Sequence, residues 1–155
     1  MKKSRPQEPD IFVRPIAAAR QTLDRHDVAA QADIAGLEPF MEASIAAAMI
    51  IAHADGTADR AEHRRIIALF QASPLLRGFS ADDVAREIAD HADAFERDHA
   101  SALARAETHI RHADLSDSQF RGLIEVCVSV LEADGHRHPA EEQALAAIAA
   151  LRGRN

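Results

Sequence analysis

Apolar side chains recur along the chain at intervals of three and four residues, which is the spacing of one buried face on an α-helix. Almost no stretch alternates between apolar and polar residues as a half-buried strand does. Proline, glycine and capping residues divide this pattern into about seven segments of helical length. The sequence therefore predicts an all-α fold, a single-domain bundle of about seven helices.

The N-terminal part of the chain is the least regular. Residues 1–10 carry two prolines and no apolar core, so we expect a disordered tail there and a helical domain over residues 11–155. Pro15 suits the first position of a helix of several turns. Gly36 and Pro39 predict a break, with the next helix beginning near Pro39.

The run from Ala81 to His112 contains neither glycine nor proline. Its length exceeds that of the usual globular helix. We therefore expect two helices here, with a break near Asp98 to Ser101, and Ser80 is the expected N-cap of the first. Ser116 and Gln119 have the spacing of a capping box that opens the helix after these two.

A repeated motif organises the rest of the chain. Ala54-Asp55-Gly56 is echoed 79 residues later (134 − 55 = 79) by Ala133-Asp134-Gly135, and in each copy four variable positions separate the glycine from an Ala-Glu pair. Apolar runs of helical period precede and follow each copy. Each copy therefore predicts a helix, an Asp-Gly turn and a second helix. Two such halves are expected to pack together, because neither can bury its apolar face alone.

The helix that follows each turn begins with a recognisable capping pattern. Asp59 and Glu62 have the spacing of a capping box, in which each side chain bonds to the backbone N–H of the other residue. In the second copy His138 is the expected cap, Pro139 the favoured first residue and Glu141 the acid at the third position. Histidine is a poor cap, so the second box is the weaker one.

The aspartates of the two turns fit a structural role less simply than the glycines do. Gly56 and Gly135 follow helix ends, where glycine reaches the left-handed conformation without penalty. Asp55 and Asp134 lie at the negative end of the helix dipole, where an exposed acid costs about 0.3–1 kcal/mol. Accepting hydrogen bonds from turn amides or binding a cation would each offset this cost. The sequence leaves both explanations open.

The number of neighbouring carboxylates favours a cation. Oxygen-rich clusters bind divalent ions, and we predict a site for Ca²⁺, Mg²⁺, Mn²⁺ or Zn²⁺. An EF-hand does not explain the spacing, because Ile51 and Val130 would occupy the first ligand position of its loop. The predicted ligands are Asp55, Asp59, Glu62, Asp134, Glu141 and Glu142.

Nine histidines are the other unusual feature of the composition. His109 and His112 are neighbours on one helix face, where solvent-facing side chains are the simpler interpretation. His136 and His138 flank the second turn beside its carboxylates, and they are candidate additional ligands. Imidazole ligands would shift the preference of the site toward Zn²⁺.

Charge and motif content exclude several classes of function. The net charge of −7 without a basic stripe argues against nucleic-acid binding, and it suits a cation or a basic partner surface. Cys127, the single cysteine, lies on an apolar stripe and is expected to be a small core residue. No nucleophile motif and no glycine-rich phosphate loop is present, so we expect no enzymatic activity. The longest weakly polar run, Ser44 to Ala54, is too short to span a bilayer, so direct membrane insertion is not expected.

The segment from about Met41 to Gly153 resembles the TerB family of tellurite-resistance proteins. The resemblance rests on the two motifs and on the spacer that separates them. The matching residues are Ala52-His53-Ala54-Asp55-Gly56 with Glu62, Leu131-Glu132-Ala133-Asp134-Gly135 with Glu141, and Phe70, Ser73, Gly78-Phe79, Phe95 and Asp98 of the spacer.

The resemblance implies an all-helical fold with two similar halves around one core and acidic clusters that bind a divalent metal. It also implies a role in tellurite resistance and stress responses, exerted through partner proteins of which some are membrane-embedded. We therefore expect a non-enzymatic cytoplasmic protein that a partner recruits to the inner face of the membrane. His138 stands where many relatives carry an acid, which leaves the identity of the metal open. The alternative is a purely structural helical domain for protein–protein interaction, with no metal site.

Overall fold

The computed structural model describes residues 36–74 and 76–153, and every regular element in this part of the chain is helical. The predicted all-α bundle is confirmed. The helix expected from Pro15 and the tail expected over residues 1–10 both lie outside the described residues. The elements are a helix over residues 36–52 (the central helix), α2 (Arg60–Ala72), α3 (Ala81–Arg97), α4 (His99–His112), α5 (Asp117–Glu132), α6 (Pro139–Ala150) and the short 3₁₀ helix η1 (Leu151–Gly153).

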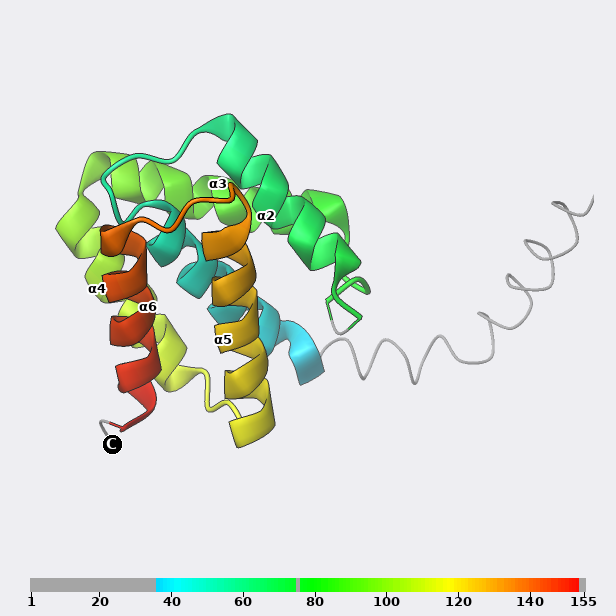
Figure 1. The fold of residues 1–155 in the computed structure, drawn as a ribbon. Coiled ribbons are helices and arrows are strands. Elements are labelled where there is room, and N and C mark those ends of the chain that lie inside the picture. Colours follow the sequence, from blue (N-terminus) through cyan, green and yellow to red (C-terminus); the bar gives the residue numbers. More distant parts are fainter. Residues whose placement is uncertain (1–35, 75, 154–155) are drawn as a thin grey trace, which may run out of the picture. The chain divides into compact units, whose positions relative to one another are not determined.

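The central helix forms the core of the bundle. No residue from Ala43 to His53 is more than 4% exposed. A helix that is apolar around its whole circumference is stable only when it is covered on all sides, and in Figure 1 the other helices surround this one. Its many alanines allow these neighbours to approach closely. None of the described helices is long and apolar enough to cross a membrane.

The two predicted halves pack against each other. The central helix and α2 form the first helix–turn–helix unit, and α5 and α6 form the second, lying side by side in Figure 1. α2 packs against both α3 and α5, so the second helix of one half contacts the first helix of the other. Gly122 of α5 also faces the central helix, since a Cβ atom there would lie 3.2 Å from the ring of Phe40.

Most of the predicted helix starts are confirmed. Glu62 N–H donates to Asp59 Oδ1 at 2.9 Å, and Asp59 N–H donates to Glu62 Oε2 at 2.8 Å, which completes the capping box. Ser116 and Gln119 form a second capping box at the start of α5. Ser80 caps α3 by accepting a hydrogen bond from the N–H of the third helical residue.

The two predicted helix breaks had different outcomes. The break near Asp98 is confirmed, because Asp98 ends α3 and its Oδ1 accepts from Ser101 N–H at 3.1 Å to begin α4. The helix expected to begin near Pro39 is present and already includes residue 36, and a break before it would lie outside the described residues. A proline in the first turn of a helix lacks only an N–H that would have no intrahelical partner there.

Candidate functional site

Both Asp-Gly turns have the backbone conformation that the motif predicts. Gly56 and Gly135 have φ angles of +110° and +75°, in the range that favours glycine. Asp55 Oδ1 accepts a hydrogen bond of 3.4 Å from the N–H of Thr57, and Asp134 Oδ1 accepts one of 2.8 Å from the N–H of His136. Both aspartates therefore accept the turn hydrogen bonds that the purely structural explanation requires.

The second turn holds its aspartate more firmly than the first. Asp134 Oδ2 lies 3.3 Å from Nε2 of His138, so both carboxylate oxygens have a partner. The pKa of Asp134 is lowered, mainly by the hydrogen bond from the N–H of His136 and further by His138. His138 is the N-cap of α6, as predicted, but it makes no side-chain capping bond. Its ring contacts the aspartate instead.

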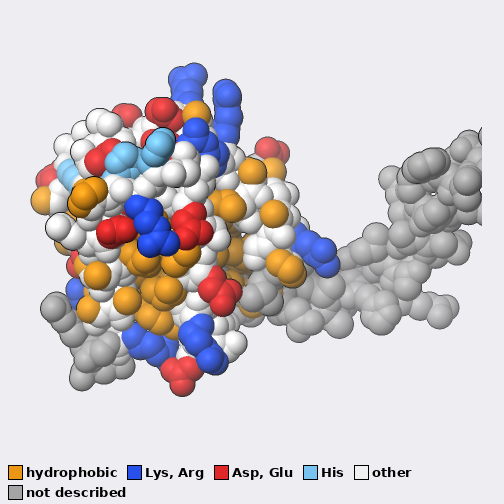
Figure 2. Space-filling model, viewed as in Figure 1, with side chains coloured by type: hydrophobic (Ala, Val, Ile, Leu, Met, Phe, Trp, Pro, Cys, Tyr) orange, Lys and Arg blue, Asp and Glu red, His pale blue; other side chains and the backbone are white. Residues whose placement is uncertain are grey.

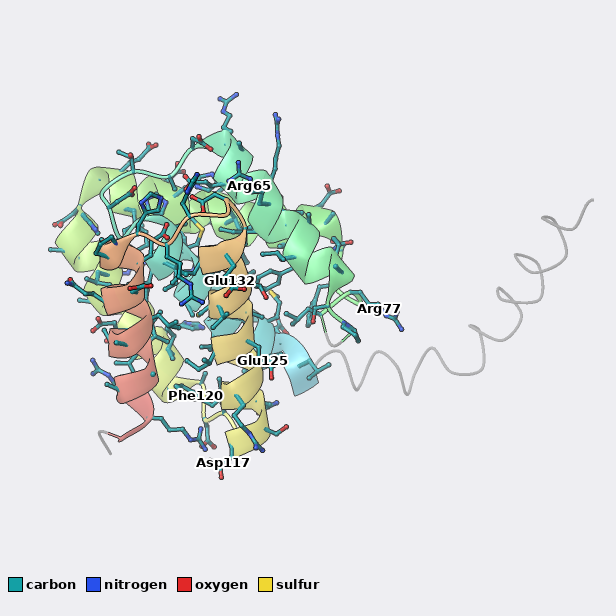
Figure 3. All side chains as sticks on the ribbon, viewed as in Figure 1. Arg65, Arg77, Asp117, Phe120, Glu125 and Glu132 are labelled. Carbon is teal, nitrogen blue, oxygen red and sulfur yellow. The ribbon has the colours of Figure 1, made fainter. Side chains whose placement is uncertain are left out.

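The two helix–turn–helix halves meet across one small cavity, which residues of the second turn line and Asp55 and Gly56 of the first do not. Glu62 from the first copy and Asp134 and Glu141 from the second line a space of about 20 Å³, which is enough for a single water molecule or ion. Arg65 of α2 lines the same cavity but forms no ion pair within 4.0 Å among the described residues. Figure 3 shows Arg65 on the side of α2 near the loop that joins α5 to α6. Three of the six predicted ligands are thus brought together.

Glu141 is the most unusual carboxylate of this group. It is only 7% exposed, and its Oε2 atom is buried without a hydrogen-bond partner. Burial raises its pKa, and the negative charges of Asp134 and Asp55 raise it further, against the opposing effect of His138. The sequence indicates an acid in the first turn of a helix, a position that is normally solvated. The packing of the two halves buries it.

The remaining predicted ligands do not line the cavity, and Asp59 and Glu142 interact with other residues. Asp59 is engaged in the capping box, and Glu142 lies 3.8 Å from Arg137, which also bonds to Glu132 at 2.8 Å. The side chain of His136 is exposed. Figure 2 shows histidine and acidic side chains together on this face, where the loop between α5 and α6 lies. Across residues 36–74 and 76–153, no three His, Cys, Asp or Glu side chains are arranged, as they stand, to hold a metal ion.

A group of histidines near the first turn was missed by the sequence interpretation. His53 is 3% exposed and stacks on Phe95 at a ring-centroid distance of 4.6 Å, with His63 at 5.8 Å. His99 contacts the edge of the same phenyl ring at 5.2 Å. Burial, together with the charges of His63 and His99, lowers the pKa of His53 to about 4. One signal was available: His53 continues the inward-facing stripe of Ile45 and Met49 at intervals of four residues.

The other singled-out residues have simple roles. Cys127 is fully buried, as predicted, and burial raises its pKa to about 12. His109 lies 3.5 Å from Glu42 of the central helix, whereas His112 is exposed. None of these three lines the cavity between the turns.

Comparison with known proteins places the chain in a family. The model of the family described as "Tellurite resistance protein TerB" matches residues 41–153, which include both motifs and the cavity between them. No curated protein and no solved structure matches the chain. Because the match covers well over half of the sequence and both helix–turn–helix halves, the chain belongs to the TerB family of tellurite resistance proteins.

Proposed function

We propose that this protein is a non-enzymatic metal-binding module of tellurite resistance and stress response, in which the two acidic turns share one divalent cation. The observation that carries the proposal is the cavity between the two halves, which Glu62, Asp134 and Glu141 all line. Glu141 supports it most strongly, because a buried carboxylate oxygen without a partner is costly and a cation would satisfy it.

The donors available at this cavity suit a hard cation. Glu62 uses Oε2 in the capping box, so Oε1 remains for an ion, and Asp55 lies close enough for its charge to act on Glu141. Carboxylate oxygens favour Ca²⁺, Mg²⁺ or Mn²⁺, whereas participation of His138 would favour Zn²⁺. Because the side chains must first rearrange to converge on one point, we expect weak binding, with a Kd of roughly 10⁻⁴–10⁻³ M.

Family membership supports the rest of the proposal. The protein would act in the cytoplasm by docking other tellurite-resistance or stress proteins, and a membrane-embedded partner would recruit it to the inner face of the membrane. The net charge of −7 suits a basic partner surface and disfavours nucleic acid. The protein would have no enzymatic activity, and its single cysteine, Cys127, is a poor nucleophile because its thiol is buried and has a pKa of about 12.

A purely structural interaction domain is the competing function. It is favoured by the local hydrogen bonds of the turns, since Thr57 and His136 already supply donors to Asp55 and Asp134. On this interpretation the Asp-Gly turns only shape the surface that a partner contacts, and no ion is needed.

The two functions differ in their response to Asn substitutions. Asp55→Asn and Asp134→Asn keep a turn acceptor and relieve the unfavourable interaction with the helix dipole. We expect the metal-free double variant to be as stable as the wild type or more stable, and to lose the thermal stabilisation that millimolar Ca²⁺, Mg²⁺ or Mn²⁺ gives the wild type. Thermal melts of chelator-stripped protein with each ion measure this. An equal metal response in the wild type and the double variant would leave the interaction domain as the better account.

A further inference from the structure

A second group of metal-ligating side chains lies beyond the cavity between the turns. His53 follows the last turn of the central helix, His63 lies in α2 and His99 begins α4. The rings of His53 and His99 both contact Phe95 near the end of α3, and the ring of His63 lies beside that of His53. None of the three histidines lines the cavity that Glu62, Asp134 and Glu141 share.

One ring nitrogen of each of these histidines is buried without a hydrogen-bond partner. Five buried side-chain N or O atoms of the described residues have no hydrogen bond, and three of them are His53 Nε2, His63 Nε2 and His99 Nδ1. Buried polar atoms in folded proteins are nearly always paired, so three unpaired atoms in one cluster require an explanation. A cation is one ligand that satisfies several imidazole nitrogens together.

We propose that His53 and His63 form a two-histidine site for an imidazole-preferring transition-metal ion, represented by Zn²⁺. Their ring centroids are 5.8 Å apart, with planes inclined at 33°. Two imidazoles on one tetrahedral Zn²⁺, each with its nitrogen at about 2.0–2.1 Å, have centroids roughly 5 Å apart. The observed spacing is close to this value, so a modest movement of His63 would bring the two rings to the spacing of a shared ion.

The site has a fixed half and an adjustable half. His53 is 97% buried and stacked on Phe95, so its ring is held in place, whereas His63 is only half-buried. Because Nε2 of both rings is buried, an ion between them would be shielded from bulk solvent, with water in the coordination positions that the protein leaves open. The donors are nitrogen, and the carboxylates of the two turns are hard oxygen donors, so the two sites select different ions.

Zinc titration of the full chain tests the assignment. Isothermal titration of Zn²⁺ into chelator-stripped protein should give one site whose affinity falls at least about tenfold in His63→Gln. His112→Gln is the matched control, because His112 is an exposed histidine of α4, and its affinity should stay within about twofold of the wild type. X-ray absorption of the Zn²⁺-loaded wild type should show two imidazole ligands. This measurement uses only the wild type, so it remains valid even if a variant does not fold.

Two further variants separate this site from the acidic one. The Asp55→Asn/Asp134→Asn double variant should keep its Zn²⁺ affinity while losing any Ca²⁺ response. The Ca²⁺ response tests the acidic site and the Zn²⁺ affinity tests the histidine site, so either proposal can fail without the other. The His136→Gln/His138→Gln double variant should also keep its Zn²⁺ affinity. Loss of Zn²⁺ binding in that second variant with full binding in His63→Gln would overturn the proposal. So would a wild type that binds no Zn²⁺, or a loaded site without imidazole ligands.

Discussion

Replacing Glu141 with glutamine is the sharpest test of the arrangement at the two turns. The change removes the charge and keeps the shape of a side chain that is only 7% exposed. A buried polar group without a partner costs about 1–3 kcal/mol, and a charged one costs more. A glutamine amide is cheaper to bury but still loses part of its hydration. We therefore expect metal-free Glu141→Gln to be about 1 kcal/mol more stable than the wild type, which raises Tm by about 2–4 °C.

The pH dependence of this difference follows from the direction of the pKa shift. Folding raises the pKa of Glu141 above its ordinary value of 4.5, so the folded state binds the proton more tightly than the unfolded state does. The contribution of this group to wild-type stability is therefore fully present below pH 4.5 and is lost as the pH rises through the raised pKa. The advantage of Glu141→Gln should be largest near pH 7 and should shrink as the pH falls toward 4.5.

Urea denaturation in the presence of a chelator, at several pH values between 5 and 8, measures this difference. Glu125→Gln is the control, because Glu125 is an exposed acid of α5 (Figure 3) and its replacement should change stability by less than about 0.5 kcal/mol. The reasoning is refuted if Glu141→Gln is less stable than the wild type at pH 7, or if the difference does not vary with pH. Added millimolar metal should reverse the order of stability if the proposed cation site exists.

Two other predictions concern the turn and the core. Gly135→Ala should cost about 1–2 kcal/mol in urea denaturation, because its φ of +75° strains a residue with a Cβ atom. Since no neighbouring atom lies within 4 Å of that Cβ, Gly135→Asn should cost less, and equal costs would point to a clash instead of backbone strain. Cys127 should react with a thiol reagent only at the rate of unfolding, because its buried thiol has a pKa of about 12. Rapid labelling of the native protein would contradict this.

The sequence by itself determined most of the local structure. Helical periodicity, the Asp59–Glu62 and Ser116–Gln119 boxes and the break at Asp98 are set by residues within a few positions of one another, and each is confirmed. The positive φ angles of the two turn glycines were likewise predicted from neighbouring residues and are confirmed. The helix start near Pro39 was predicted only approximately, because a proline is accepted anywhere in the first turn and does not fix the first residue.

The tertiary structure alone decided which side chains meet. Glu62, Asp134 and Glu141 line one cavity only because α2 packs on α5, and the same contact buries Glu141, whose place in a first turn predicts exposure. His53 and His63 lie on the two sides of the first turn, and the way the central helix and α2 pack on each other sets their rings side by side. Caps and helix periods arise from short-range hydrogen bonds and side-chain spacing, which adjacent residues specify. The burial of Glu141 and the grouping of carboxylates at one cavity depend on contacts between helices of the two halves. A local sequence pattern does not specify which side chains such contacts bring together.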